Sequence, residues 1–197
     1  MNCVDLNAAS RDLLPEACTA CTWWQKGAAD ETPAASRAAW EHHVESEAGM
    51  FGRALLDGAD VLGWMQAAPA ALVRRGLPGG PPSSDSYLLA CAFFYDEQFL
   101  AGFQMLLQDL IAAVKLRRVE ALEAYALRDP APDLRFTGYL RELNLFNAHV
   151  LEGCGFSRVR AAGGVGRYRL ELKALVAVSR RGRSVEQPQG AAATIPA

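Results

Sequence analysis

One segment of the sequence constrains the fold more than any other, the apolar run SYLLACAFFY from Ser86 to Tyr95. A continuous apolar run of this length predicts a strand that is buried on both faces, because a half-exposed strand would alternate polar and apolar side chains. Such a strand needs helices or a second sheet against each face. The sequence therefore predicts a layered domain with this strand near its centre.

The segment after this strand has the pattern of a long amphipathic helix. Apolar side chains recur along one broad stripe from Phe99 to Val114. Lys115, Arg117 and Arg118 follow, where cations interact favourably with the carbonyl end of a helix. We expect the regular helix to span Gln104 to Leu116 and to pack its stripe against the sheet.

Antiparallel strands are expected before the central strand. The dipeptide Asp57-Gly58, which favours a tight hairpin turn, separates apolar runs over Phe51–Leu56 and Asp60–Ala67. A weakly alternating segment over Asn2–Asn7 predicts a short edge strand. The stretch from Pro69 to Ser86 is rich in Gly, Pro and Ser and predicts a flexible connection within one domain, since neither flank could bury itself alone.

The remaining periodic segments complete a mixed α/β order. Helices are expected over Ser10–Trp24, Pro33–Glu47 and Tyr139–Cys154, and strands over Val119–Leu127, Phe156–Ala161 and Arg167–Leu175. The segment Val119–Leu127 has helical propensity and is assigned as a strand from its position in the chain. This order predicts an α/β fold, in the α+β sense of a mixed sheet flanked by helices. We expect one domain over residues 1–178 and a disordered tail over residues 179–197.

Composition narrows the class of protein. Hydrophobic residues make up 51% of the 197 residues, enough for a sizeable core in one domain. The 20 Lys and Arg against 22 Asp and Glu give a formal charge of -2, so no overall basic field favours nucleic acid or an anionic membrane. The N-terminus lacks the pattern of a signal peptide, and we expect a cytoplasmic protein without a membrane span.

The cysteines indicate reduced thiols. Their number is odd, at five, and Cys91 and Cys154 lie in apolar segments, which is atypical of a disulfide framework. Cys18 and Cys21 have the spacing of half a zinc site, but no second pair of ligands follows with suitable spacing. We therefore expect packed or partly exposed thiols and no metal site.

The stretch from Ser86 to Phe156 resembles the GNAT (N-acetyltransferase) superfamily. In that family a buried strand ends in a Q/R-x-x-G-x-G/A turn that opens a long helix, and here QFLAGF, Gln98 to Phe103, stands at that place. The run LFNAHVLEGCGF, Leu145 to Phe156, is similar to the family's helix that leads into Gly-Phe and a strand. The N-terminal CTACTWWQ is similar to a Cys-x-x-Cys-x-x-Trp segment of actinobacterial GNAT-like proteins.

The resemblance implies a site for acetyl-CoA or another acyl-CoA. In the family, the free amides and positive dipole end of the helix hold the cofactor's diphosphate. The residues implied by position are Phe93, Phe94, Gln98, Phe99, Leu100, Ala101, Gly102 and Phe103. The motif is degenerate, because Ala101 and Phe103 stand at the two glycine positions and no cation remains in the turn.

Acyl transfer also needs a base for the amine and an acid for the departing thiolate. The family's usual Tyr position is Leu151 here, so we consider Tyr125 and Tyr139 as replacement acids, with His149 and Cys154 as further alternatives. Glu97 is the first candidate for the base. Asp96 and Glu123 remain alternatives.

Two functions stay open at this point. The first is a GNAT-like acyltransferase that acts on an amine of a small molecule or a protein. The second is a catalytically degenerate GNAT-like domain that works as a binding or regulatory module, and a homodimer is open in either case. The sequence lacks G-x-x-x-x-G-K-[ST], G-x-S-x-G and H-E-x-x-H, which argues against nucleotide hydrolases, serine hydrolases and zinc proteases.

Overall fold

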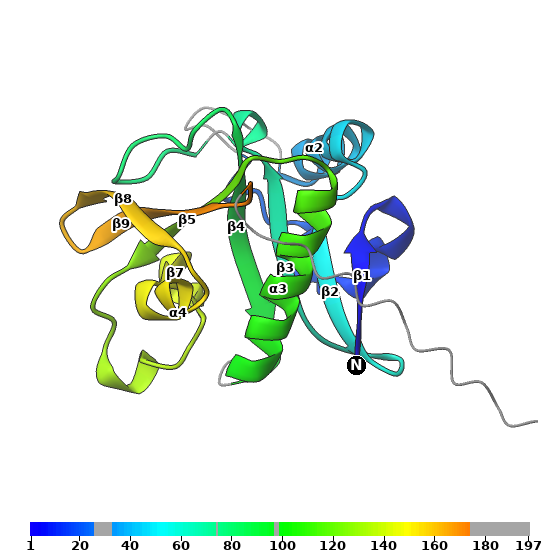
Figure 1. Cartoon of the computed structure of the whole chain (residues 1–197). Coiled ribbons are helices and arrows are strands. Elements are labelled where there is room, and N and C mark those ends of the chain that lie inside the picture. Colours follow the sequence, from blue (N-terminus) through cyan, green and yellow to red (C-terminus); the bar gives the residue numbers. More distant parts are fainter. Residues whose placement is uncertain (26–32, 74, 97–98, 174–197) are drawn as a thin grey trace, which may run out of the picture.

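The computed structural model describes residues 1–25, 33–73, 75–96 and 99–173. Within these residues, one mixed sheet of nine strands is flanked by helices (Figure 1). The strands are β1 (Asn2–Leu6), β2 (Gly52–Asp57), β3 (Asp60–Pro69), β4 (Ser86–Phe94), β5 (Ala121–Leu127), β6 (Tyr139–Leu140), β7 (Leu145–Asn147), β8 (Ser157–Ala162) and β9 (Val165–Glu171). The helices are α1 (Glu16–Thr19), α2 (Pro33–Ala48), α3 (Leu100–Leu116) and α4 (Ala148–Gly153), with short 3-10 turns at Ala8–Leu13, Ala70–Leu72, Pro132–Leu134 and Arg141–Leu143. The predicted α/β fold class is thus confirmed.

The sheet begins as an antiparallel meander and becomes parallel at its centre. β1, β2, β3 and β4 pair in this order, each antiparallel to its neighbour, and β4 pairs in parallel with β5. The other edge of β5 pairs along its full length with β9, which pairs in turn with β8. The predicted central position of the apolar strand is therefore correct, and the hairpin turn lies at Asp57-Gly58, where Gly58 has a φ of 60°.

Two apolar cores lie on opposite faces of this sheet. α3 crosses one face (Figure 1) and buries Leu106, Leu107 and Leu110 against the sheet. The other face is covered by the N-terminal segment and α2, with Leu6, Trp24 and Val44 in its core. Neighbouring residues of a strand point to opposite faces, so Met65 belongs to the α3 core and Trp64 to the other. This double covering explains the continuous apolar sequence of β4.

β4 and β5 separate halfway along their length. Their pairing joins Ser86–Leu89 to Ala121–Ala124, although both strands continue beyond these residues. At the same point the register between β3 and β4 shifts, so that Ala90 has no partner in β3. A β-bulge of this kind bends its strand. Beyond the bulge, the edge of β5 that faced β4 pairs instead with β7 at Ala126 and Leu127.

The expected helix over Ser10–Trp24 is wrong. The segment forms a 3-10 turn over Ala8–Leu13 and the short helix α1, separated at Pro15. Asn7 and Ser10 cap the first turn reciprocally, which starts the turn earlier than expected. Pro15 has no amide hydrogen and forces Leu14 into an extended conformation, so one continuous helix cannot form.

The expected helix over Tyr139–Cys154 is also wrong in its first half. Tyr139 and Leu140 pair antiparallel with Phe146 and Leu145, and only α4 is helical. Asn144 adopts a left-handed conformation with a φ of 53°, which asparagine tolerates and which ends the 3-10 turn between the two strands. The hairpin places β6 beside the separated end of β4.

The connection after β3 is tied to the sheet by polar contacts. The Tyr125 hydroxyl donates to the carbonyl of Gly80 at 2.5 Å. The buried carboxylate of Glu123 accepts from the Ser83 hydroxyl at 2.7 Å and pairs with Arg169 at 3.0 Å. These bonds connect a segment without helix or strand to β5. The predicted disordered tail lies outside the described residues. Within the described residues, no helix combines the length and the apolar character of a membrane span.

Candidate functional site

The start of α3 lies where β4 and β5 separate. Phe99 is the N-cap residue of this long helix, and its side chain makes no capping hydrogen bond. The first amides of any helix have no partner within the helix and carry the positive end of its dipole. The amide of Phe103 donates to the carbonyl of Phe99 at 3.0 Å. The amides of Leu100, Ala101 and Gly102 precede it, which suits an anion.

A small cavity lies between α3 and the separated end of β4, and we call it the α3 cavity. Its volume is about 20 Å³. It is lined by Ala92, Phe93, Phe94, Phe99, Phe103, Gly138, Tyr139 and Arg141. Because one water needs a cavity of at least about 10–15 Å³, this space holds roughly a single water molecule.

Two phenyl rings fill most of the space on this side. Phe103 is 3% exposed and packs against Phe94 and Phe146, with ring centroids 5.9 Å and 6.2 Å away. A methyl group at Gly138 would lie 2.4 Å from the Phe103 ring, so the chain needs glycine at this close approach. The ring of Phe99 lies over Gly102 in the same way. A ligand that passed between β4 and α3 would have to displace these rings.

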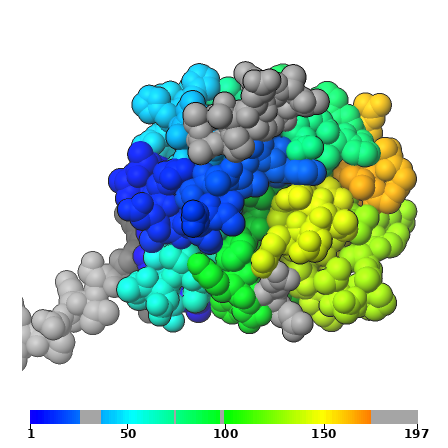
Figure 2. Space-filling view, turned by 180° about the vertical axis from the view of Figure 1, so that it is seen from behind, coloured from blue at the N-terminus to red at the C-terminus, as the bar shows by residue number. Residues whose placement is uncertain are grey.

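A larger cavity lies on the opposite face of the sheet, and we call it the N-terminal cavity. Its volume is about 200 Å³. It is lined by Ala17, Cys18, Cys21, Trp24, Gln25, Arg37, Trp64, Gln66, Cys91, Ala92, Phe93, Tyr139, Arg141 and Asn144. Figure 2 shows the blue N-terminal segment beside the yellow segment, and residues from both of these parts of the chain line the cavity.

Tyr139 lines both cavities and so marks the place where they approach each other. Its side chain is 7% exposed, its ring meets Phe146 edge to face at 4.8 Å, and its hydroxyl donates to Asn144 Oδ1 at 3.3 Å. Burial raises the pKa of the Tyr139 phenol well above its ordinary value, and the neighbouring Trp24 side chain lowers it by a smaller amount. The phenol therefore keeps its proton at neutral pH.

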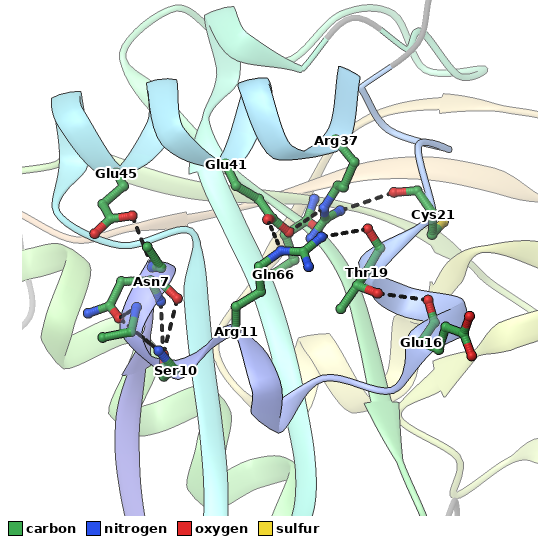
Figure 3. Close-up of polar contacts among 12 residues, drawn as sticks. Asn7, Ser10, Arg11, Glu16, Thr19, Cys21, Arg37, Glu41, Glu45 and Gln66 are labelled. Atoms are coloured by element: carbon green, nitrogen blue, oxygen red, sulfur yellow. Dashed lines mark hydrogen bonds and ion pairs between the residues drawn. The ribbon is translucent and has the colours of Figure 1, made fainter. Parts of the chain in front are cut away.

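A buried ion pair supports the floor of the N-terminal cavity (Figure 3). Arg37 is 2% exposed, and its Nε donates to Glu41 Oε1 at 2.6 Å. Arg37 Nη1 donates to Gln66 Oε1 at 2.7 Å and to the carbonyl of Cys21 at 3.3 Å. Glu41 also accepts from Arg11 Nε at 2.6 Å. These contacts join α2 and β3 to the N-terminal segment.

The other candidate acids and bases have different surroundings. Tyr125 is 1% exposed, stacks on Trp24 at 6.0 Å and lines neither cavity. Glu123 is fully buried and bonded to Ser83, Arg167 and Arg169, so its oxygens are engaged. His149 lies exposed on α4, 3.9 Å from Glu152. Among these described candidates, Tyr139 alone lines the α3 cavity or the N-terminal cavity.

The turn itself is partly beyond the described residues. Glu97 and Gln98 lie outside them, so the structure does not place the candidate base or the first residue of the turn. Phe93 and Phe94 end β4 on opposite faces, Phe93 beside the N-terminal cavity and Phe94 in the α3 core. The structure thus brings Phe93, Phe94, Phe99 and Phe103 to one site with Tyr139.

The described thiols are free and partly buried except for Cys21, which is exposed. Burial, with a smaller effect of Cys21, raises the pKa of the Cys18 thiol to about 11, and burial also raises the pKa of Cys91. The described residues contain no group of three or more His, Cys, Asp or Glu side chains suited to a metal ion.

Sequence reasoning missed the cluster of Arg37, Glu41 and Gln66. One signal was available, since Arg and Glu four residues apart face the same side of a helix. The spacing alone does not distinguish a buried pair from a solvated one. Gln66 lies within an apolar strand, and a buried polar residue of this kind needs a partner that only the fold can supply.

No protein-family model and no curated protein matches the sequence. Among solved structures, the chain is similar to a ribosomal-protein-alanine N-acetyltransferase from Brucella melitensis, with 15% identity, a TM-score of 0.51 and coverage of 87% of this chain and 99% of that chain. It is also similar to the ribosomal-protein-S18-alanine N-acetyltransferase from Escherichia coli, with 12% identity, a TM-score of 0.49 and coverage of 91% and 97%. A putative acetyltransferase from Salmonella typhimurium, solved with its cofactor acetyl-CoA, has 13% identity, a TM-score of 0.49 and coverage of 91% and 98%.

At these identities the likeness shows the fold. The chain has the fold of the GNAT N-acetyltransferases, as the sequence resemblance implied. The similarity to an actinobacterial group and the cofactor role of the degenerate turn stay predictions.

Proposed function

We propose that this chain is a GNAT-fold acyltransferase that moves an acetyl or longer acyl group from acyl-CoA to an amine of a small molecule or a protein in the cytoplasm. One observation carries the proposal. The separation of β4 from β5 after Leu89 leaves two cavities, one on each face of the sheet, that share Ala92, Phe93, Tyr139 and Arg141. A donor on the α3 side and an acceptor on the N-terminal side could meet there.

The diphosphate of the cofactor would lie at the start of α3. The amides of Leu100, Ala101 and Gly102 are the groups for it, together with Gln98 from the turn. Gly102 is buried beneath the Phe99 ring, so its amide would become accessible only when that ring moves. Ala101 is exposed, so its amide lies near the surface. This part of the site fits a coenzyme A diphosphate.

The thioester end of the cofactor fits less well. The free volume of about 20 Å³ is too small for its chain, so the rings of Phe99 and Phe103 would have to rotate away. This rearrangement costs binding energy, and an acyl chain that replaces the ring contacts would offset part of the cost. We therefore expect longer acyl groups to bind more tightly than acetyl.

Tyr139 is the proposed acid. Its buried phenol holds its proton at neutral pH and stands between the two cavities, where it could donate that proton to a departing thiolate. Glu97 stays the proposed base, because a carboxylate near the end of β4 could accept the proton of the amine.

Two measurements test the proposal. Isothermal titration with acetyl-CoA and with longer acyl-CoAs should show binding, tighter for the longer chains, and absence of heat at millimolar ligand would remove the proposal. In a thiol-release assay over a panel of amines, Tyr139→Phe should lower turnover by about a hundredfold or more, since general acid catalysis contributes about 10²–10⁴-fold. Tyr95→Phe, which changes an exposed tyrosine, is the matched control and should leave turnover unchanged.

A second candidate function follows from the same cavity. The small free volume and the buried Phe103 favour a degenerate GNAT-fold domain that binds a ligand or partner without acyl transfer. Thiol release that depends on an amine from any member of the panel would count decisively against this alternative. Binding of ligand in the N-terminal cavity without any acyl-CoA binding would support it.

A further inference from the structure

The N-terminal cavity has walls that suit a flat apolar ligand. Four aromatic side chains line it, namely Trp24, Trp64, Phe93 and Tyr139. Trp64 and Phe93 lie nearly parallel, with ring centroids 6.5 Å apart and an interplanar angle of 15°. An engineered cavity of about 150 Å³ binds benzene, so the 200 Å³ here accommodates a single ring with a short substituent.

The same walls hold buried polar atoms that lack a partner within the described residues. These atoms are Arg37 Nη2, Gln66 Nε2, Trp24 Nε1, Trp64 Nε1 and both amide atoms of Gln25. All five side chains line the cavity, and none is more than 6% exposed. Leaving a buried polar group unpaired costs about 1–3 kcal/mol, and more when the group is charged. Each of these groups therefore lacks a compensating hydrogen bond within the described residues.

The unpaired atoms are mainly donors, and the charge around them is positive. Arg37 and Arg11 share the single carboxylate of Glu41, which leaves one positive charge in this cluster. Arg141 adds a second guanidinium to the lining, over the ring of Phe93 at 4.7 Å. Among the described residues that line the cavity, none is Asp or Glu. A ligand that presents negatively charged oxygens would complement this lining.

We propose that the N-terminal cavity binds a small aromatic carboxylate, with its ring between the aromatic walls and its carboxylate toward Arg37, Gln66 and Trp64. A guanidinium with one free nitrogen beside two neutral donors matches the lone pairs of a carboxylate. If the ligand also carries an amine, it could present that amine to Tyr139 and so serve as the acceptor of the acyl group. This role as acceptor rests on the proposed function. Binding itself needs no acyl-CoA.

The first experiment compares three probes of similar shape by isothermal titration in the absence of acyl-CoA. We expect phenylacetate to bind at least about tenfold more tightly than neutral phenylacetamide, since a hydrogen bond to a charged group contributes about 1.5–3 kcal/mol. Cationic phenethylamine, which has no carboxylate, should bind most weakly. Equal affinity of the acid and the amide, or no binding of the acid at millimolar concentration, would overturn the inference.

A pair of tryptophan variants tests the placement of the ligand. Trp64→Phe keeps an aromatic wall but removes one donor, and we expect it to weaken phenylacetate binding by about three- to tenfold. Trp23→Phe is the matched control, because Trp23 also has an unpaired indole nitrogen but does not line the cavity. Equal losses in the two variants would contradict the placement. Arg37→Gln should abolish the preference for acid over amide, with circular dichroism used to confirm that this variant folds.

The two proposals fail separately. Phenylacetate binding without any acyl-CoA binding would remove the proposed acyl transfer and leave the carboxylate site intact. Acyl-CoA binding and turnover without any preference for a carboxylate would do the reverse.

Discussion

The α3 cavity and the N-terminal cavity adjoin the same residues of β4 and β6, yet they differ tenfold in volume, with about 20 Å³ against about 200 Å³. On the α3 side, the first turn of a regular helix directs the rings of Phe99 and Phe103 into the space, and apolar contacts fill it. On the other side, the chain from Pro15 to Gln25 forms only the short helix α1 and turns, and polar side chains beside it have atoms without a partner in the described residues. Close packing of phenyl rings leaves little free volume in the α3 cavity, whereas the larger N-terminal cavity is lined by polar groups without a partner.

The largest effect is expected at the α3 cavity. Phe103→Ala should lower the free energy of unfolding by about 3–5 kcal/mol, because the ring is buried among Phe94, Phe146 and Gly138. Urea denaturation measures this change. Phe136→Ala, at a phenylalanine that is 67% exposed, is the control and should change stability little. A small loss of stability in Phe103→Ala would mean that the α3 side is loosely packed, and the contrast between the two cavities would then be wrong.

The next effect is expected at the ion pair beside the N-terminal cavity. Glu41→Gln should lower stability by about 2–3 kcal/mol, since it leaves the buried Arg37 without its carboxylate. Thermal and urea unfolding measure the loss. Glu47→Gln on the same helix, where the carboxylate is exposed, serves as the control. If both variants lose equally little, the buried cluster does not organise the cavity.

A smaller effect is expected at Gly138, which lies very close to the ring of Phe103. Gly138→Ala should cost about 1–2 kcal/mol, because the new methyl group would overlap a ring that its neighbours hold in place. Gly153→Ala, where a methyl group meets nothing within 4 Å, is the matched control and should be neutral or slightly stabilising. Differential unfolding of the two variants decides whether the ring has room to move.

The smallest effect concerns the thiol of Cys18 in the N-terminal cavity. Because burial raises its pKa to about 11, its alkylation by iodoacetamide should continue to accelerate about tenfold per pH unit up to that value. In the unfolded chain the Cys18 thiol has its ordinary pKa and loses its proton at lower pH than in the folded protein. The contribution of Cys18 to the free energy of unfolding is therefore present below pH 9 and is lost as the pH rises from 9 to 11. Mass spectrometry of alkylated peptides measures the rate. A plateau near pH 9 would show that the cavity is open to water.

Much of the fold could be predicted because local pattern and burial agree in most segments. The apolar run of β4, the Asp57-Gly58 hairpin and the stripe of α3 each depend on neighbours in the sequence, and the structure confirms all three. The strand β5 required an argument from position, since its own propensity favours a helix. The two wrong helices failed at Pro15 and at Asn144, where one backbone conformation ends the periodic pattern.

The candidate site was less predictable, because its members are far apart in the sequence. Tyr139 was chosen as one of several alternatives, and only the pairing of β6 with β7 places it between the two cavities. Arg37 and Gln66 carry no motif that distinguishes them from surface residues. Their partnership depends on α2 packing over β3.

The sequence by itself determined the layers of this protein, because hydrophobic period and turn chemistry are local properties of the chain. The tertiary structure decided which cavity is open. Whether a phenyl ring fills a space or a guanidinium nitrogen lacks a partner depends on the distance between elements. That distance follows from the bulge at Ala90 and from the β6–β7 hairpin beside it. No local pattern encodes such a distance, since it is set by packing among segments that meet only after folding.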